Sequence, residues 1–301
     1  MRVLITGSMG FVGRSLREYL LRAGYEVIGI DSRPNSDYNV DILDLHRLIE
    51  VFRRVEPDAV IHLAAISSPP ACLSDQYNCF KVNVLGTLNV LEAAKLTSLK
   101  RFIYASSANV YGAPKESPVR ETAPLNPRTP YDYSKVAAEQ VVRSYSRLGV
   151  PSVILRSWKL FGEYDSNESA ISRFIDACLM NRPLTLYNDG RDVTDPCYVD
   201  NFSHMVDLIL KKYNCDGCEV FNVGTGRSVS IKELAIKIRT LTDSRSELKT
   251  LPPRSELESE PMVSYPSIEK ASEHLGYRPL VMLEEGLGRV IEHRSRTLGL
   301  R

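Results

Sequence analysis

The feature that most constrains the fold is a run of three glycines between an apolar strand and an amphipathic helix. The segment LITGSMGFVGRSL places Gly7, Gly10 and Gly13 directly after the apolar residues 2–6. Gly7 allows a tight turn, and Gly10 lets the backbone approach a ligand closely. The helix that follows presents free N–H groups and the positive end of its dipole. This arrangement predicts a binding site for a pyrophosphate.

A carboxylate follows at the end of the second predicted strand. Asp31 closes the segment EVIGID, 18 residues after Gly13, where a side chain can hydrogen-bond the ribose of a dinucleotide. The same carboxylate repels a 2′-phosphate and therefore favours NAD over NADP, whereas the nearby Arg33 favours NADP. The sequence thus predicts a dinucleotide site that prefers NAD.

Short apolar segments alternate with amphipathic segments through the first half of the chain. Strands are predicted at residues 2–6, 26–31, 58–65, 101–107 and 152–156, and helices at 11–24, 43–55, 81–96 and 130–149. Continuous apolar strands, each followed by a helix, indicate a parallel sheet that is covered on both faces. We therefore expect an α/β fold built on a doubly wound parallel (Rossmann) sheet.

The pattern loosens after Arg156, where polar stretches rich in turn residues separate the remaining helices. One more strand is predicted at residues 219–224. We expect a NAD-binding domain over residues 1–156, with further elements of that domain around residues 197–226. Residues 157–301 should then form mainly a smaller C-terminal substrate-binding lobe that closes over the carboxyl edge of the sheet.

Charge and hydropathy exclude several classes of protein. Lys plus Arg total 38 against 37 for Asp plus Glu, so the chain lacks the basic excess that is typical of nucleic-acid binding. No apolar run approaches the roughly 18 residues of a membrane span, and the N-terminus does not resemble a secretory signal. We expect no nucleic-acid partner, no membrane association and a cytoplasmic location.

The six cysteines are spread along the chain, unlike those of a small disulfide-rich scaffold. Cys215 and Cys218 form a CxxC, but no second CxxC or nearby histidine pair completes a zinc site. We interpret the CxxC as a turn with two incidental thiols and predict no metal site. His62, in AVIHLAA, is interpreted as a core histidine at the end of a strand.

The segment PYDYSK opens the helix that is predicted from Pro130. Tyr131 and Lys135 are four residues apart and share one face of that helix, whereas Tyr133 and Lys135 point away from each other. A nearby ammonium group favours the phenolate form of a phenol, whose ordinary pKa is about 10. Tyr131 is therefore the predicted partner of Lys135 and a candidate acid/base, and Tyr133 is a predicted packing residue.

Several further segments occur with these features: SSANVYG at 106–112, HLAA at 62–65, KVNVLGTLNV around Asn83, FNVGTG at 221–226 and LGYRPLVMLEEGL near the C-terminus. Together they resemble the extended short-chain dehydrogenase/reductases. Within that superfamily the chain is most similar to the NAD-dependent sugar epimerase/dehydratase family, and in particular to its UDP-glucose/UDP-galactose 4-epimerases. The resemblance implies NAD as the cofactor, a nucleotide-sugar substrate, a homodimer, and catalysis by Ser107, Tyr131 and Lys135.

The resemblance also assigns binding residues. It implies cofactor contacts from the glycine turn, the strand ends and the catalytic helix, namely Gly7, Gly10, Phe11, Val12, Gly13, Asp31, Ser32, Asp41, Ile42, Leu63, Ala64, Ala65, Asn83, Tyr131, Lys135 and Trp158. It implies substrate contacts from Ser107, Tyr131, Lys159, Tyr187, Arg191 and Arg254.

Two positions depart from the family pattern. Where the family usually has RYFN, this chain has RSWK, so Lys159 replaces an asparagine that is expected to bind phosphate. Where the family usually has RDF, this chain has TDP, so the expected arginine is absent at Thr194 unless Arg191 replaces it. Arg254 lies near the place of another phosphate-binding arginine of the family.

The residues after Ser107 bear on the choice of reaction. Sugar 4,6-dehydratases have an acidic residue or pair there, because elimination of water needs an additional acid and base, whereas this chain has Ala108 and Asn109. A 4-epimerase needs only the tyrosine, the serine and a retained NAD. We therefore expect 4-epimerisation of a UDP-hexose through a 4-keto intermediate.

Two alternatives remain open. The first is an NAD(P)-dependent reductase of a GDP-4-keto-6-deoxy sugar. The short link between Asp31 and Asp41 resembles the corresponding link in such reductases. The second is a non-catalytic sensor protein that binds a dinucleotide, which the two departures from the family pattern favour.

Overall fold

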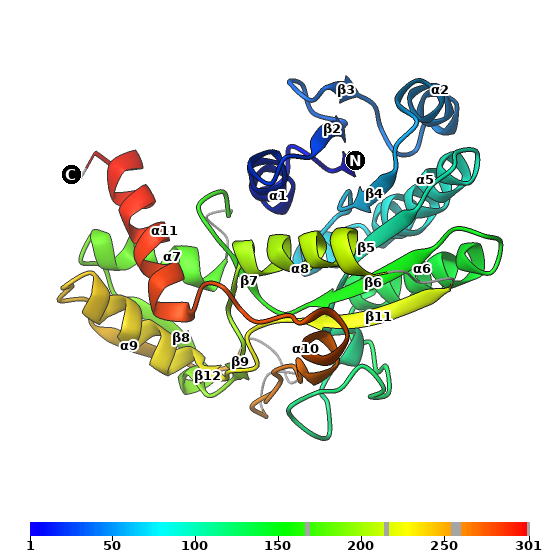
Figure 1. Cartoon of the computed structure of the whole chain (residues 1–301). Helices are drawn as coiled ribbons and strands as arrows, with labels where there is room; N and C mark the ends of the chain where they lie inside the picture. Colours follow the sequence, from blue (N-terminus) through cyan, green and yellow to red (C-terminus); the bar gives the residue numbers. More distant parts are fainter. Residues whose placement is uncertain (166–168, 214–216, 254–259, 300–301) are drawn as a thin grey trace.

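Seven parallel strands form the central sheet of the computed structural model, which describes residues 1–165, 169–213, 217–253 and 260–299. The strands lie in the order β11-β6-β5-β4-β1-β2-β3 (Figure 1). Their bounds are β1 (Arg2–Thr6), β2 (Glu26–Asp31), β3 (Tyr38–Asn39), β4 (Ala59–His62), β5 (Arg101–Ser107), β6 (Ser152–Ser157) and β11 (Cys218–Val223). The chain runs outward from β1 to β3 and then returns to β4 beside β1. This reversal creates a crevice at the carboxyl ends of β1 and β4, where ligands bind in folds of this kind.

Alternating side chains of the strands pack against helices on opposite faces of the sheet. Val3 and Ile5 belong to one buried cluster and Leu4 belongs to the other, because successive side chains of a strand point to opposite sides. The first face is covered by α1 (Phe11–Arg22), α8 (Val199–Lys212) and α10 (Glu269–Leu275). The second face is covered by α2 (Leu45–Val55), α5 (Gly86–Lys95) and α6 (Pro130–Ser146).

A smaller lobe with its own core lies beside the sheet (Figure 1). It contains α7 (Ala170–Leu179), β8 (Leu184–Tyr187), α9 (Ile231–Leu241), β13 (Leu248–Leu251) and α11 (Leu283–Thr297). Short strand pairs connect it to the sheet: β7 (Leu160–Phe161) with β10 (Cys197–Tyr198), and β9 (Val193–Thr194) with β12 (Val229–Ser230). Phe11, the first residue of α1, packs against the core of this lobe, so the lobe adjoins the glycine turn.

The secondary structure of residues 69–85 differs from the one predicted from the sequence. They form α3 (Pro69–Ser74), α4 (Gln76–Phe80) and a π-helical turn (Lys81–Leu85), whereas only a helix from residue 81 was expected. Ser68 caps α3, and Asp75 ends α3 and caps α4. The strand expected over residues 58–65 ends at His62, so residues 63–65 are free to turn at the carboxyl edge.

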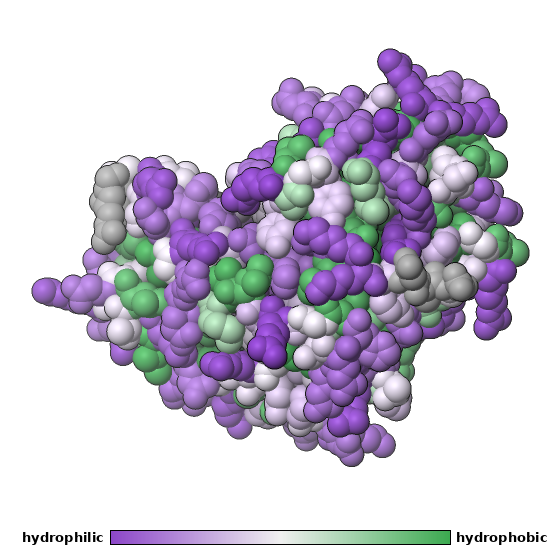
Figure 2. Space-filling model, viewed as in Figure 1, coloured by the Kyte–Doolittle hydropathy of each residue, from purple (hydrophilic) through white to green (hydrophobic). Residues whose placement is uncertain are grey.

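The structure confirms a doubly wound parallel sheet with a smaller C-terminal lobe. None of the helices in the described ranges has both the length and the apolar composition that crossing a bilayer requires. Figure 2 shows one face of the molecule as mainly hydrophilic, with hydrophobic residues in small separate patches.

Candidate active site

The glycine turn lies where β1 meets α1, at the carboxyl edge of the sheet. Gly7 has a φ of +72°, in the left-handed region that favours glycine, and a Cβ there would lie 2.7 Å from the Ala64 amide nitrogen. A Cβ on Gly13 would lie 2.2 Å from the Gly7 carbonyl oxygen, so only glycine lets the helix and strand approach this closely. Among the described residues no side chain caps Gly10 at the start of α1, which leaves the first N–H groups to an anion. These residues fit the pyrophosphate of a dinucleotide.

Asp31 is buried at the end of β2, beside the glycine turn. Its carboxylate accepts hydrogen bonds from the Met9 amide at 2.9 Å and from Arg33 through the amide at 3.0 Å and Nε at 3.1 Å. Burial acts to raise the pKa of Asp31, but the hydrogen bonds from Arg33 and Met9 outweigh it, and the pKa lies below its usual value. Asp31 is therefore ionised at neutral pH and can accept a ribose hydroxyl.

The other expected cofactor residues of the turn and strand ends lie along the same edge. Phe11 and Val12 form the first turn of α1, and Ser32 follows β2 directly. Leu63, Ala64 and Ala65 follow β4, and Asp41 and Ile42 follow β3. Their contacts with a cofactor stay predictions.

Asn83 uses its side chain within the protein. Its Oδ1 accepts from the Ile66 amide at 2.7 Å, and its Nδ2 donates to the Ile66 carbonyl at 3.1 Å and to Ser134 Oγ at 2.9 Å. Ser134 Oγ in turn donates to the Tyr131 carbonyl at 2.7 Å. Asn83 therefore joins the loop after β4 to α6, and its expected contact with the cofactor stays a prediction.

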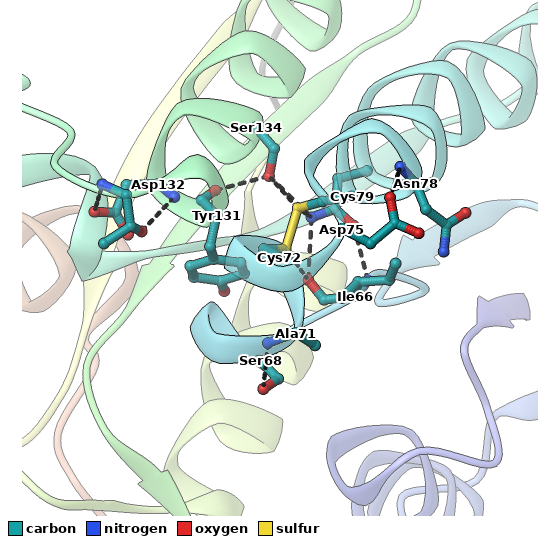
Figure 3. Close-up of a disulfide and its surroundings, with 12 residues drawn as sticks. Ile66, Ser68, Ala71, Cys72, Asp75, Asn78, Cys79, Tyr131, Asp132 and Ser134 are labelled. Atoms are coloured by element: carbon teal, nitrogen blue, oxygen red, sulfur yellow. Dashed lines mark hydrogen bonds between the residues drawn. A yellow bond between two sulfur atoms is a disulfide. The ribbon is translucent and has the colours of Figure 1, made fainter.

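A disulfide joins Cys72 of α3 to Cys79 of α4 beside this junction (Figure 3). Both cysteines are fully buried in one cluster with Tyr131 and Ile66, and Asn83 Nδ2 donates to Cys79 Sγ at 3.6 Å. This disulfide was not predicted from the sequence. Their separation of seven residues is the sequence signal for the pairing. Asp75 ends α3 and caps α4, so the two cysteines lie on separate short helices.

Trp158 also makes its visible contacts within the protein. Its ring stacks on Tyr111 with centroids 5.7 Å apart, and its Nε1 donates to the Ser264 carbonyl at 3.1 Å and to Ser264 Oγ at 3.2 Å. Trp158 thus ties a segment of the C-terminal half to the carboxyl end of β6. Its expected cofactor contact stays a prediction.

The three expected catalytic residues converge at the carboxyl end of β5. Ser107 ends β5, and Tyr131 lies in the first turn of α6, whose start is fixed by a capping box between Thr129 and Asp132. The Lys135 ammonium lies 6.0 Å from the centre of the Tyr131 ring. Tyr131 is 7% exposed whereas Tyr133 is 54% exposed, so the helical face predicted for Tyr131 and Lys135 is the buried one. The prediction that Tyr133 packs within the chain is wrong, because its position two residues from Tyr131 turns it toward solvent.

Burial shifts the pKa of both helix residues. Burial raises the pKa of Tyr131 to about 12, although a hydrogen bond from Ser107 opposes that shift. Burial lowers the pKa of Lys135 to about 8, and the nearby Glu139 opposes it. In the residues that the structure describes, burial therefore outweighs the lowering of the Tyr131 pKa that was expected from Lys135.

His62 is confirmed as a buried core histidine. Thr87 Oγ1 donates to the Asn83 carbonyl at 2.6 Å, so His62 Nε2 donates to Thr87 at 2.9 Å and His62 Nδ1 accepts from Thr6 at 2.6 Å. Burial, helped by the charge of Lys135, lowers the pKa of His62 to about 3. The imidazole is therefore neutral at neutral pH and connects β1, β4 and α5.

The expected substrate residues are spread over the edge of the sheet and the lobe. Lys159 is exposed just beyond β6, Tyr187 ends β8, and Arg191 donates through Nε to the Asn188 carbonyl at 3.3 Å. Arg191 lines a pocket of about 400 Å³ in the lobe together with Asn188, Asp189, Thr250, Leu251, Pro252 and Pro253. Arg254 lies outside the described residues.

Asp195 occupies the turn that follows Thr194, where the family arginine is missing. Its carboxylate accepts from the Thr225 amide at 2.6 Å, Thr225 Oγ1 at 2.7 Å and the Gly226 amide at 2.8 Å. Thr194 itself pairs with Val229 in the β9–β12 ribbon. Asp195 therefore holds the FNVGTG turn.

Cys215 of the CxxC lies outside the described residues, and Cys218 opens β11. Within the described ranges, no three or more His, Cys, Asp or Glu side chains form a group that could hold a metal ion.

Comparison with known proteins places the chain in a family. A model of the NAD-dependent epimerase/dehydratase family matches residues 3–224. A putative UDP-glucose 4-epimerase of Methanocaldococcus jannaschii is 33% identical over 96% of this chain and 97% of its own length. UDP-glucuronic acid decarboxylase 1 of Danio rerio is 33% identical over 99% of this chain and 73% of its own length.

A solved structure is similar over the whole chain. It is a UDP-glucose 4-epimerase from Thermotoga maritima with UDP-glucose, which is 29% identical with a TM-score of 0.92, and the match covers 99% of this chain and 100% of that one. The fold, the glycine turn and the Ser/Tyr/Lys cluster define a short-chain dehydrogenase/reductase. This chain belongs to the NAD-dependent epimerase/dehydratase family of that superfamily. NAD as the cofactor class is thereby confirmed.

Proposed function

We propose that this protein is a nucleotide-sugar 4-epimerase that inverts the configuration at C4 of a UDP-hexose through a 4-keto intermediate. The observation that carries the proposal is the meeting of Ser107, Tyr131 and Lys135 at the carboxyl end of β5, followed by a turn without a carboxylate. Ala108 is buried and Asn109 is exposed in that turn. Elimination of water requires a further acid and base, and neither residue supplies one.

The residues divide the chemistry among them. Tyr131, in its phenolate form, takes the proton from the sugar 4-hydroxyl, and Ser107 holds the same oxygen. Burial raises the pKa of Tyr131, so the phenolate would need the hydrogen bond from Ser107 and the positive charges of Lys135 and of bound oxidised nicotinamide to oppose that burial. Oxidised NAD supplies the hydride acceptor when it is bound. After the keto sugar has turned over, the hydride would return from the reduced cofactor to the opposite face of C4 and Tyr131 would return the proton to the oxygen, which completes the inversion.

The UDP-glucuronic acid decarboxylases supply a second candidate reaction, because one of them is as similar to this chain as the putative epimerase is. Oxidation of a uronic acid at C4 creates a β-keto acid, which loses carbon dioxide without an additional acid at the position of Asn109. The same three catalytic residues therefore support either reaction, and the sugar substrate distinguishes them.

A substrate panel tests the proposal. The purified protein is first analysed for bound NAD and is then incubated with UDP-glucose, UDP-galactose, UDP-glucuronic acid and a GDP-4-keto-6-deoxy sugar. Interconversion of the two UDP-hexoses without added cofactor supports the epimerase. Release of carbon dioxide from UDP-glucuronic acid would replace it by the decarboxylase, and consumption of NADPH with the keto sugar would replace it by the reductase. Bound NAD without turnover of any sugar would favour the sensor protein.

The substrate lobe and the assembly complete the proposal. We propose that residues 157–301 mainly bind the nucleotide sugar and that two chains form a homodimer. Exposed apolar side chains along α3, α4, the π-helical turn and α6 support the dimer: Leu73, Tyr77, Phe80, Leu85 and Tyr133. A mass of one chain in light-scattering measurements would reject the homodimer.

The Cys72–Cys79 disulfide bears on the cellular location of the protein. It weighs against the expected cytoplasmic location, because cytosolic thiols are kept reduced.

A further inference from the structure

A buried ion pair lies directly behind the catalytic residues of α6. Glu139 is fully buried, and its carboxylate accepts from Arg156 through Nε at 3.0 Å and through Nη2 at 2.7 Å. Nη1 of Arg156 donates to Tyr111 Oη at 3.0 Å, and Tyr111 Oη donates to Asn222 Oδ1 at 2.8 Å. A two-point guanidinium–carboxylate pair fixes the geometry of both side chains. The network therefore holds α6, β6 and β11 together below the site.

The same helix is braced on β5 at three consecutive strand residues. Residues spaced by four on α6 share one face, and each of the three contacts a different residue of the strand end. The pairs are Tyr131 with Ser107, Lys135 Nζ with the Ala105 carbonyl at 2.9 Å, and Glu139 Oε1 with Ser106 Oγ at 2.6 Å. The contact of Glu139 is thus the last member of a series that begins with the catalytic tyrosine.

We propose that Glu139 is a positioning residue for Lys135 and Tyr131, with Arg156 as its counter-ion. Its hydrogen bond from Ser106 sets the register of α6 on β5. Its negative charge stabilises the ammonium form of Lys135. The spacing of four residues between Tyr131, Lys135 and Glu139 can be read from the sequence. The ion pair of Glu139 with Arg156 appears only in the folded structure.

The charges around Lys135 fix the direction of the effect. Tyr131 and Glu139 face it from α6, Tyr104 faces it from β5 with its ring centre 5.0 Å from the ammonium, and His62 faces it from β4 as a neutral ring. Glu139 is the one carboxylate among these four neighbours. Removing its charge therefore lowers the pKa of Lys135 further, because burial then acts with less opposition.

A titration that needs no sugar tests this inference apart from the proposed function on which its kinetic part rests. The Lys135 side chain is followed by carbon NMR in the NAD-bound protein, and its signal is assigned with Lys135→Arg. Lys135 should titrate below the ordinary range of a lysine in the unaltered protein, because burial lowers its pKa. In Glu139→Gln it should titrate roughly one pH unit lower. The kcat with whichever sugar the panel identifies should fall by roughly tenfold.

Two further variants separate positioning from simple loss of stability. Ser106→Ala removes the brace without removing a charge, so it should lower kcat several-fold and leave the Lys135 titration in place. Asp176→Asn disrupts another ion pair, with Arg294 in the lobe, and should lower stability while leaving both the titration and kcat unchanged. An unshifted Lys135 titration in Glu139→Gln would overturn the inference. So would an unchanged kcat in Ser106→Ala, whether or not Glu139→Gln folds.

Discussion

The guanidinium of Arg33 forms a two-point ion pair with the carboxylate of Asp31, with Nε 3.1 Å from Oδ1 and Nη2 3.3 Å from Oδ2. The two residues whose side chains favour different cofactors thus form one ion pair, in which Asp31 is buried and Arg33 is about half exposed. Arg33 reduces the repulsion that Asp31 would exert on a 2′-phosphate without removing the acceptor for a ribose hydroxyl.

Cofactor preference should therefore respond in opposite directions to the two residues. We expect the unaltered protein to bind NAD more tightly than NADP, Asp31→Asn to relax that preference, and Arg33→Ala to sharpen it. Dissociation constants for both cofactors, measured by fluorescence quenching, provide the check. Equal or tighter binding of NADP by the unaltered protein would reject the role of Asp31.

Replacing Tyr131 by Phe removes the oxygen that we propose exchanges the proton with the sugar. We expect turnover to fall by roughly 100-fold or more, the scale of general acid–base catalysis, with the fold and NAD binding retained. Tyr133→Phe is the matched control, because Tyr133 lies two residues away on the exposed face of the same helix. A large loss in the control and a small one in Tyr131→Phe would show that the acid/base had been misassigned.

Lys159→Ala tests whether a lysine substitutes for the family asparagine at the substrate diphosphate. Loss of a hydrogen bond to a charged group costs roughly 1.5–3 kcal/mol, so KM should rise by roughly 10- to 150-fold with NAD binding unchanged. Lys100→Ala is the control, since Lys100 pairs with Asp58 at the opposite edge of the sheet. If KM did not change in Lys159→Ala, the diphosphate would have to be held by Arg191, Arg254 or backbone N–H groups.

His62 should make the stability of the protein depend on pH. Its pKa is about 3 in the folded protein, against 6.5 for an ordinary histidine, so below neutral pH the unfolded chain binds a proton that the folded protein does not. Stability from this residue is present above pH 6.5 and is lost as the pH falls toward 3. Between about pH 7.5 and 5 the loss should reach about 2 kcal/mol.

Urea unfolding across that pH range measures this contribution. His62→Gln should be less stable at neutral pH and should show a weaker pH dependence than the unaltered protein. His46→Gln should keep the original pH dependence, because the His46 side chain is 85% exposed. The same slope in both variants would show that His62 does not carry the effect.

The disulfide between Cys72 and Cys79 should contribute modestly to stability. It closes a loop of seven residues, for which the loss of unfolded-state entropy is worth about 2–3 kcal/mol. The double variant Cys72→Ala/Cys79→Ala should lose about that amount in urea unfolding. Reductant should destabilise the unaltered protein and leave the double variant unaffected. If Cys72 and Cys79 both reacted as free thiols in the denatured protein without reductant, the pairing would be wrong.

The local features of the site were accessible from the sequence because each depends on residues close together in the chain. The left-handed φ of Gly7 and the close approach at Gly13 are properties of one strand–turn–helix unit. Likewise, a spacing of four sets Tyr131 and Lys135 on one helical face, and a spacing of two sets Tyr133 on another. The order of strands and helices followed from apolar periodicity for the same reason.

The partners of the polar side chains were decided only by the tertiary structure. Glu139 meets Arg156 because β6 lies between β5 and β11, and strand order in a sheet is not a property of any one segment. Asn83 and Trp158 were expected at the cofactor, yet they also hydrogen-bond to Ile66 and Ser264. The sequence by itself determined where a dinucleotide can bind and which tyrosine shares a helical face with Lys135. Tertiary packing decided which buried charges and hydrogen bonds hold them there, because those groups come from separate segments and become neighbours only after the sheet has assembled.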